Sequence, residues 1–287
     1  MTKQFSPTST TLVLLAGMLA TAACRAEPLP LWEIGAGIAT LNAPDYRGSD
    51  VNTSRVFPVP YFVYRGSLFK ADREGLRSTL FDSDRAEVSF SANATMPITR
   101  NNATHRSEAE RKATVAFGPS LNVDLWNSQD KQQALVFRAP VRTGITLEAK
   151  PKMVGWTFSP GLDYHVYNVA GASGWNVGLL GGVIFSDKKY NARFYSISPS
   201  EATASLPVYS APGGYSGAQA TLSLSKRFQK YWLGSFVRYD SVAGAVFEHS
   251  PLVKKSGGVS AGFAFSWVFG QSSTMVGAEN PIFHDAK

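Results

Sequence analysis

The stretch that decides the fold is residues 155–166, GWTFSPGLDYHV, in which two kinds of side chain alternate. The even-numbered positions are apolar or aromatic, and the odd-numbered positions hold Gly, Thr, Ser, Asp and His. A period of two is typical of a β-strand with one apolar and one polar face. Residues 86–95, 114–126 and 259–269 alternate in the same way.

Eight further segments have the composition of strands, which brings the predicted number to twelve: 31–40, 54–64, 68–81, 133–142, 175–186, 190–197, 217–228 and 231–240. Polar stretches such as 127–131 and 229–230 separate them as turns. The segment 57–60 contains two prolines, which is unusual for a central strand because proline cannot donate to the hydrogen-bond ladder. Because no long helical pattern and no shift in composition occurs, we expect an all-β, antiparallel, single domain.

Two architectures can use such strands: a soluble sandwich buries the apolar faces, and a membrane barrel turns them toward lipid. The segments are about 10–13 residues long, near the 9–11 that a tilted strand needs to cross a membrane. Their polar faces hold mainly Gly, Ser and Thr. Tyr and Trp recur near the segment ends, as interfacial girdles require: Trp126, Tyr164, Tyr167, Trp175, Tyr231, Trp232 and Trp267. These observations predict a transmembrane β-barrel.

The connections between the segments test this topology, because outer-membrane barrels have short periplasmic turns and long external loops. Short and long connections alternate cleanly if 190–197 belongs to an external loop. An even number of strands then requires one or three crossings before residue 68, where two candidates are visible. Twelve strands is our preferred number, and ten remains open.

The composition agrees with a barrel and excludes several classes. Of 287 residues, 44% are hydrophobic and 17% are charged, while soluble domains average roughly 25% charged. The mean hydropathy is only −0.09, too low for a bundle of membrane helices. The aromatic content of 12% excludes a disordered chain. A single cysteine excludes a disulfide framework and a cysteine-rich zinc site.

The first 26 residues have the features of a signal peptide. Lys3 precedes an apolar run over 11–23, and Cys24-Arg25-Ala26 offers a small-x-small cleavage site. The run is too short for a membrane anchor, which needs about 20 residues. Lipidation of Cys24 is the competing interpretation, although a larger aliphatic residue usually stands at the position of Thr21. Cleavage after Ala26 removes the only cysteine and two bases, which lowers the net charge from +7 to +5.

The chain resembles the MipA/OmpV family of MltA-interacting outer-membrane proteins over essentially all of residues 27–269. The matching motifs are, in order, DYRGSD (45–50), FPVPY (57–61), YRG (64–66), GP (118–119), Tyr190, FYSIS (194–198), Ala202, LPVY (206–209), Ala211, GG (213–214) and SPLV (250–253). The chain departs from the family at Ser196, where glycine is usual, and lacks an Arg-Gly-Met-Pro-type segment near 105–112. It also continues past the last aromatic strand as residues 270–287, which we expect to form a flexible periplasmic tail.

The resemblance implies a bacterial outer-membrane location and a non-enzymatic scaffold. The scaffold would link a lytic transglycosylase, which is a murein hydrolase, to a penicillin-binding protein in peptidoglycan remodelling. It implies no catalytic residue, cofactor or metal, and no motif identifies the residues that bind partners. Outer-membrane lipid and lipopolysaccharide are the other expected partners.

Two alternative functions come from the residues themselves. Small residues on the predicted lumen face, such as Gly155, Ser159 and Gly161, suggest a channel for small solutes. Asp163 and His165 share that face with Ser159 and suggest a hydrolase. Within one strand, however, Ser159 and His165 are held roughly 20 Å apart, so another strand would have to supply a partner. A hydrated lumen lining is the favoured interpretation of this trio.

The other motifs indicate no calcium, phosphate or nucleic-acid binding site. Asp45, Asp50 and Asp72 lack the ligand spacing of a calcium loop. The glycine pairs at 181–182 and 213–214 are not followed by the Lys-Ser or Lys-Thr of a phosphate loop. The basic residues are scattered over predicted loops, whereas a nucleic-acid-binding protein needs a dense basic stripe.

Overall fold

A computed structural model of the protein describes residues 29–66, 69–72, 75–83, 85–95, 114–169 and 174–276. The predicted signal peptide, with its cleavage site at Ala26, lies outside these ranges. Within the described chain, no helix is long and apolar enough to cross a membrane.

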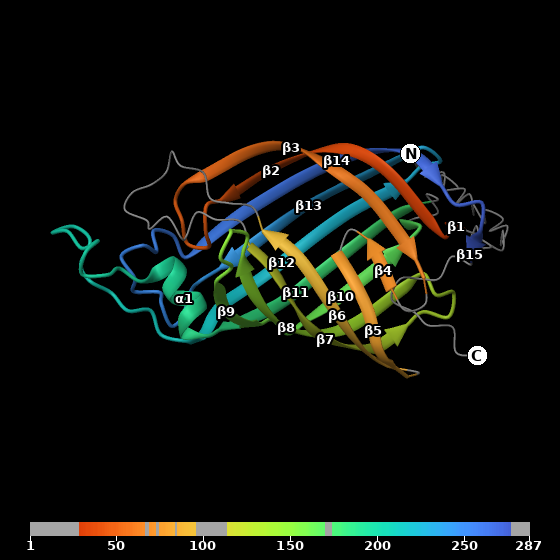
Figure 1. Cartoon of the computed structure of the whole chain (residues 1–287). Coiled ribbons are helices and arrows are strands. Elements are labelled where there is room, and N and C mark those ends of the chain that lie inside the picture. Colours follow the sequence, from red (N-terminus) through yellow and green to blue (C-terminus); the bar gives the residue numbers. More distant parts are fainter. Residues whose placement is uncertain are drawn as a thin grey trace, which may run out of the picture.

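The strands form one antiparallel sheet that closes into a barrel (Figure 1). Each strand pairs with the next, except that β9 and β10 share the neighbours β8 and β11, and the ring closes because the last long strand pairs with the first. The strands are β2 (Trp32–Pro44), β3 (Asn52–Arg65), β4 (Phe69–Asp72), β5 (Gly75–Asp82), β6 (Ala86–Thr95), β7 (Thr114–Asn127), β8 (Gln133–Thr146), β9 (Met153–Phe158), β10 (Gly161–Tyr167), β11 (Trp175–Ser186), β12 (Gly214–Arg227), β13 (Tyr231–Ser241) and β14 (Gly257–Gln271).

Residues 155–166 form one strand that is broken into β9 and β10. Both halves pair with β8 on one side and β11 on the other, with Phe158 opposite Val141 and Gly161 opposite Arg138. The break falls at Ser159 and Pro160, because proline has no N–H to give to the ladder. Counting β9 and β10 together, the described residues form a ring of twelve strands, which confirms the barrel.

Two of the twelve predicted strands were nevertheless wrong. The number of strands stays at twelve because one predicted segment forms two strands and the other forms none. Residues 68–81 form two strands, because β4 and β5 pair antiparallel with Asp72 opposite Gly75. Residues 190–197 lie mostly in a helix, α1 (Lys188–Tyr195), which begins at the capping residue Asp187. The side chain of Asp187 accepts a hydrogen bond from the backbone N–H of Tyr190, the typical signature of a helix start.

The two prolines of 57–60 lie within β3, and the sheet explains why they are tolerated. β3 pairs along its whole length with β2. On its other side it pairs with β4 only at Tyr64 and Arg65. Among the described residues, the remainder of β3 therefore has one free edge, where a missing N–H costs little.

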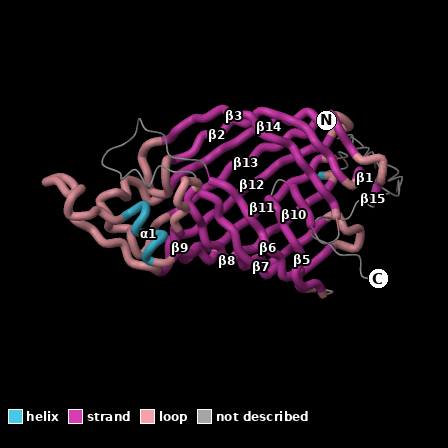
Figure 2. Tube along the Cα trace, viewed as in Figure 1, coloured by secondary structure: helices cyan, strands magenta, loops and turns pink. Residues whose placement is uncertain are grey.

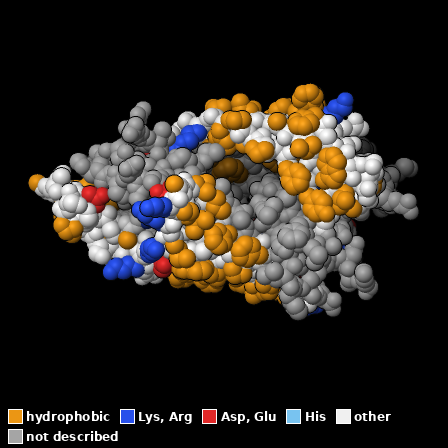
Figure 3. All heavy atoms as spheres, viewed as in Figure 1, with side chains coloured by type: hydrophobic (Ala, Val, Ile, Leu, Met, Phe, Trp, Pro, Cys, Tyr) orange, Lys and Arg blue, Asp and Glu red, His pale blue; other side chains and the backbone are white. Residues whose placement is uncertain are grey.

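The alternating pattern turns apolar side chains outward, as predicted. On β14, Val259, Phe263, Trp267 and Phe269 are 50%, 49%, 54% and 60% exposed, whereas Ser266 is buried on the inner face. Figure 3 shows the result as a hydrophobic outer wall, with the visible Lys, Arg, Asp and Glu side chains gathered toward the ends. Such a belt contacts lipid in an outer-membrane barrel.

The two ends of the barrel differ. The β5–β6, β7–β8, β10–β11 and β12–β13 connections are short and lie at one end, whereas the long connections 187–213 and 242–256 lie at the other. Figure 2 shows α1 and most of the ordered loops gathered at this second end. Since short turns face the periplasm in such barrels, the end with α1 is the extracellular mouth.

The predicted boundary at Phe269 is too early. β14 continues to Gln271, and β15 (Met275–Val276) pairs with β1 (Leu29–Pro30) at the periplasmic end. The start of the predicted flexible tail is thus ordered against the N-terminal segment, and residues 277–287 lie outside the described ranges.

Candidate functional site

Several of the motifs that carry the family resemblance meet at the extracellular mouth, whereas FPVPY (57–61), YRG (64–66) and GP (118–119) lie on the wall strands β3 and β7. Two clusters of buried hydrophobic residues lie at the mouth. The first contains Tyr195, Ala211, Val242, Ala245 and Phe247, with Tyr46, Phe194, Tyr209 and Val253 packed against it. The second contains Ile197, Leu206 and Leu252. We call these two clusters and α1 the mouth cap.

Aromatic stacking and hydrogen bonds hold the mouth cap together. The rings of Tyr195 and Phe247 stack with their centroids 3.6 Å apart. The Tyr195 hydroxyl donates to the carbonyl of Arg47 at 2.9 Å, and the Tyr46 hydroxyl donates to the carbonyl of Leu252 at 2.6 Å. Three loops that are far apart in the sequence are therefore tied into one unit.

The position of α1 depends on a glycine in the barrel wall. Gly155 of β9 has a φ of +105°, in the region that favours glycine. A Cβ at this position would lie 2.3 Å from a carboxylate oxygen of Asp187 and 2.5 Å from the backbone nitrogen of Tyr190. Glycine thus lets the first turn of α1 rest directly on the wall.

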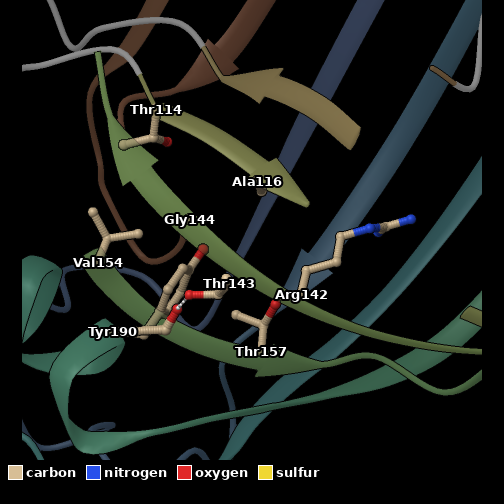
Figure 4. Close-up of a pocket in the computed structure, with 9 residues that line it drawn as sticks. Thr114, Ala116, Arg142, Thr143, Gly144, Val154, Thr157 and Tyr190 are labelled. Carbon is tan, nitrogen blue, oxygen red and sulfur yellow. Dashed lines mark hydrogen bonds between the residues drawn. The ribbon is translucent and has the colours of Figure 1, made fainter. Parts of the chain in front are cut away.

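A chamber of about 150 Å³ lies under α1, between the helix and the wall strands β7, β8 and β9. Figure 4 shows Tyr190 on the α1 side of the chamber and Arg142 reaching away from it into the barrel interior. The remaining lining residues are small or polar: Thr114, Ala116, Thr143, Gly144, Val154, Gly155 and Thr157. The Thr143 hydroxyl donates to the carbonyl of Gly155 at 3.0 Å, which ties β8 to β9.

Further arginines lie near enough to Tyr190 to act on its hydroxyl group. Arg238 holds Asp240 with two hydrogen bonds of 2.7 Å, and Arg47 approaches the same carboxylate to 3.0 Å. Burial raises the pKa of the Tyr190 hydroxyl, while the charges of Arg47, Arg238 and Arg193 oppose that rise. Tyr190 therefore stays protonated and able to donate a hydrogen bond at neutral pH.

A second charged cluster crosses the lumen at the periplasmic end. The carboxylate of Glu33, which is 1% exposed, accepts hydrogen bonds from Arg227 at 2.9 and 3.2 Å, from Tyr61 at 2.9 Å and from Arg65 at 3.4 Å. Two strands, β13 and β14, separate Arg227 on β12 from Glu33 on β2, so the contact passes through the barrel interior between strands that are not neighbours. We call these four side chains the periplasmic bridge.

The aromatic girdle prediction fails at Trp232, next to this bridge. The ring of Trp232 faces inward and lies 6.2 Å from the ring of Tyr61. Its neighbour Tyr231 is 45% exposed on the outer wall, as expected of a girdle residue. The side chains of Trp232 and Tyr231 therefore lie on opposite faces of β13, because successive side chains of a strand alternate between its two faces.

The predicted trio in the lumen does not assemble as a catalytic set. Asp163 lies 2.8 Å from His165 and accepts a hydrogen bond from Arg138 at 2.9 Å. Ser223 of β12 lies opposite Gly178, which lies opposite His165. Its hydroxyl donates to the carbonyl of Gly178 at 3.4 Å. Asp163 is therefore engaged by a permanent cation, and the described hydrogen bond of Ser223 goes to the backbone.

Asp45, one of the aspartates considered for calcium, has another partner. Asp45 accepts a hydrogen bond from the Thr53 hydroxyl at 2.6 Å, and Asp72 stands in the β4–β5 hairpin. Across the described ranges, no three His, Cys, Asp or Glu side chains come together in a way that could hold a metal ion.

Tyr190 and Gly155 were singled out from the sequence for other reasons, but the arginines near them were not, although signals existed. Arg47 lies inside a motif of the resemblance, DYRGSD. Arg238 and Asp240 stand at lumen positions of β13, where charge is costly unless it is paired or functional. Arg142 gives no signal, because only the fold brings it under α1.

Comparisons with solved structures find outer-membrane barrels. They include the CymD monoaromatic hydrocarbon channel (10% identity, 84% of this chain and 89% of that chain, TM-score 0.31). OprG of Pseudomonas aeruginosa (9% identity, 85% and 98%, TM-score 0.23) and the toluene transporter TodX of Pseudomonas putida (6% identity, 83% and 89%, TM-score 0.26) are also similar. No curated protein matches the chain.

The family comparison covers most of the chain. The family described as "MltA-interacting protein MipA" matches residues 34–269, which includes every strand from β3 to β13. Together with the closed ring and the apolar outer wall, this match identifies an integral β-barrel of the bacterial outer membrane. The chain belongs to the family of the MltA-interacting protein MipA.

Proposed function

We propose that this protein is a non-enzymatic scaffold of the outer membrane that binds a lytic transglycosylase and a penicillin-binding protein during peptidoglycan remodelling. The observation that carries the proposal is the family match over residues 34–269, because that family is described by its interaction with MltA. The proposal extends this description to the present chain.

The periplasmic bridge supports a scaffold over a conduit. Glu33 on β2 is joined through Arg227 to β12, three positions away in the ring, and Trp232 meets Tyr61 beside them. At the other end, the mouth cap packs over the barrel. Because one end of the barrel is bridged and the other is capped, the barrel is better suited to binding partners on its surface than to conducting solutes.

Association with the envelope follows from the same surfaces. The hydrophobic wall contacts lipid, and lysines of the mouth loops such as Lys189, Lys254 and Lys255 lie where they would meet lipopolysaccharide phosphates. We include both in the proposal as the surroundings in which the scaffold works.

Co-purification from solubilised envelopes tests the proposal. The tagged barrel is extracted in mild detergent, and captured proteins are identified by mass spectrometry. Recovery of a murein hydrolase or a penicillin-binding protein is expected. Recovery of neither, under conditions in which a known hydrolase–synthase pair survives, would contradict the scaffold. An unrelated outer-membrane barrel with the same tag controls for adhesion to detergent micelles.

A small-solute channel is the second candidate, and one observation favours it. Among the described residues, the part of β3 before Tyr64 has no strand partner on the edge opposite β2. On the face drawn in Figure 3, the wall is hollowed between hydrophobic areas. Planar-bilayer recordings decide between the two candidates, since a folded barrel that carries no current excludes the channel.

A further inference from the structure

A lysine lies on the outer wall at the periplasmic end of β12. On this strand Leu222 and Leu224 are exposed and Ser225 is buried, so the even-numbered residues form the outer face. Lys226 is the next residue on that face, and β12 ends one residue later at Arg227. A lysine in the middle of a lipid-facing belt destabilises a barrel, but this cost nearly disappears at the interface. Lys226 therefore lies where the acyl chains of the membrane give way to the head groups.

Two aromatic rings hold the ammonium group of Lys226 at this surface. Its nitrogen lies 5.4 Å from the centroid of the Trp175 ring and 4.9 Å from the centroid of the Phe228 ring. Trp175 lies directly opposite Lys226 on β11, and Phe228 follows Lys226 by two residues and is exposed. An ammonium group within about 6 Å of a ring centroid is attracted to the face of the ring. The rings therefore position the ammonium group, but they carry no charge that neutralises it.

The strands around Lys226 supply no carboxylate to pair with it. β11 and β12 contain no Asp or Glu, and the acid of β13, Asp240, stands at the opposite end of the barrel. The two connections at this end, 168–174 and 228–230, contain no Asp or Glu either. Glu33 lies inside the barrel, where it binds Arg227. Within the part of the chain that the structure describes, Lys226 forms no ion pair, so its charge faces the membrane without a counter-ion from the wall.

An apolar surface extends from Lys226 toward the middle of the wall. Leu224 precedes Lys226 on the outer face of β12, and Leu233 lies opposite Lys226 on β13. Phe265 of β14 lies opposite Leu233 and stacks on Tyr231 with the ring centroids 5.5 Å apart. Hydrocarbon chains can lie along these side chains while an anion meets the ammonium group. The surface therefore matches an amphiphile with an anionic head group and acyl chains.

We propose that Lys226 binds the phosphate group of a glycerophospholipid in the periplasmic leaflet of the outer membrane. Trp175 and Phe228 position the ammonium group, and the acyl chains lie along Leu224 and Leu233. A soluble phosphate lacks the acyl chains and gains nothing from this part of the wall. The proposal rests on the contact with lipid in the proposed function and not on the scaffold, because lipid binding and co-purification of the two enzymes are measured separately.

Native mass spectrometry of the full exported protein, purified in detergent and freed of bound lipid, tests the proposal with dioleoyl phosphatidylglycerol as the probe. Dioleoylglycerol carries the same acyl chains without the phosphate, and glycerophosphoglycerol carries the phosphate without the chains. The wild-type protein is expected to bind the phospholipid more tightly than either of these. Lys226→Gln is expected to weaken binding of the phospholipid about fivefold, the effect of one basic side chain at an anionic membrane surface. The same variant is expected to leave binding of dioleoylglycerol unchanged.

Three further variants separate the charge from its position. Lys226→Arg is expected to keep the affinity for the phospholipid, because a guanidinium group also stacks on aromatic rings and binds phosphate. Phe228→Leu keeps an apolar side chain but removes one ring, and it is expected to weaken phospholipid binding by less than Lys226→Gln does. Lys131→Gln removes an exposed charge from the β7–β8 turn at the same end and is expected to change nothing. Heat-modifiable migration on gels checks that each variant is folded.

Four results would overturn the proposal. The first is phospholipid binding of equal strength in the wild-type protein and Lys226→Gln. The second is equal weakening by Lys131→Gln, since any charge at this end would then act without the rings. The third is equal binding of phosphatidylglycerol and dioleoylglycerol by the wild-type protein, which would assign the surface to hydrocarbon alone. The fourth is equal binding of glycerophosphoglycerol and the phospholipid, which would assign it to a soluble phosphate.

Discussion

Replacing Glu33 by alanine removes the carboxylate at the centre of the periplasmic bridge. The change deletes the contacts to Arg227 at 2.9 and 3.2 Å, to Tyr61 at 2.9 Å and to Arg65 at 3.4 Å. It leaves two arginines inside the barrel without the anion that neutralises them. The side chains of Arg65 and Arg227 are 23% and 20% exposed, so water compensates for part of the loss.

The expected loss of stability follows from these contacts. Removing one partner of a buried ion pair costs about 3–5 kcal/mol. Because both arginines keep some access to water, we expect Glu33→Ala to lower the free energy of unfolding by the smaller amount, about 3 kcal/mol. Urea unfolding in lipid vesicles, followed by tryptophan fluorescence, measures this value.

Glu201→Ala is the matched control. Glu201 lies in a mouth loop, where its carboxylate accepts hydrogen bonds from the backbone and hydroxyl of Ser198. An exposed contact of this kind contributes about 1 kcal/mol or less. The two variants lose the same side chain, so the difference between them reports the position of Glu33 in the lumen.

The same variant tests whether the bridge closes the barrel. Planar bilayers containing Glu33→Ala are expected to show larger and more frequent currents than bilayers with the wild-type protein or with Glu201→Ala. If Glu33→Ala is as stable as Glu201→Ala and passes no more current than the wild type, the bridge neither supports nor closes the barrel, and the reasoning is refuted.

Three other predictions concern the mouth and the lumen. Phe247→Ala removes the ring stacked on Tyr195 and is expected to cost about 3–5 kcal/mol, with faster proteolysis of the external loops as the measurement; unchanged cleavage would show that the mouth cap does not depend on this stack. Gly155→Val is expected to displace the first turn of α1 at Asp187, because its Cβ would meet that residue at 2.3 Å; a wild-type rate of hydrogen exchange in α1 would argue against this contact. His165→Ala is expected to leave any trace of ester hydrolysis by the purified protein unchanged, and a loss of that activity would reinstate the hydrolase.

The strand faces were predictable from the sequence because a period of two follows directly from strand geometry. The outward side chains of β14 and of the 155–166 segment lie where the alternation puts them. The same rule produced the error at 190–197. Tyr190, Ala192 and Phe194 alternate with polar residues, which imitates a strand. The cap at Asp187 and the burial of Tyr195 in the mouth cap favour a helix. Neither effect can be read from the alternation of apolar and polar residues within 190–197.

The site was less predictable, because its residues come from distant parts of the chain. Arg227 and Glu33 are 194 positions apart and meet only across the closed barrel. Arg142 and Tyr190 lie on β8 and α1, and Gly155 on β9 determines how closely α1 approaches the wall. The motifs of the family resemblance did mark the mouth cap, but the motifs alone do not say that these segments pack together.

The most direct test of the scaffold is a reconstitution with purified components. A lytic transglycosylase is immobilised, and a penicillin-binding protein is passed over it with or without the barrel in detergent micelles. We expect the penicillin-binding protein to be retained only when the barrel is present, at a ratio that saturates with the barrel. Equal retention with and without the barrel, or no retention in either case, would contradict the claim that this protein links the two enzymes.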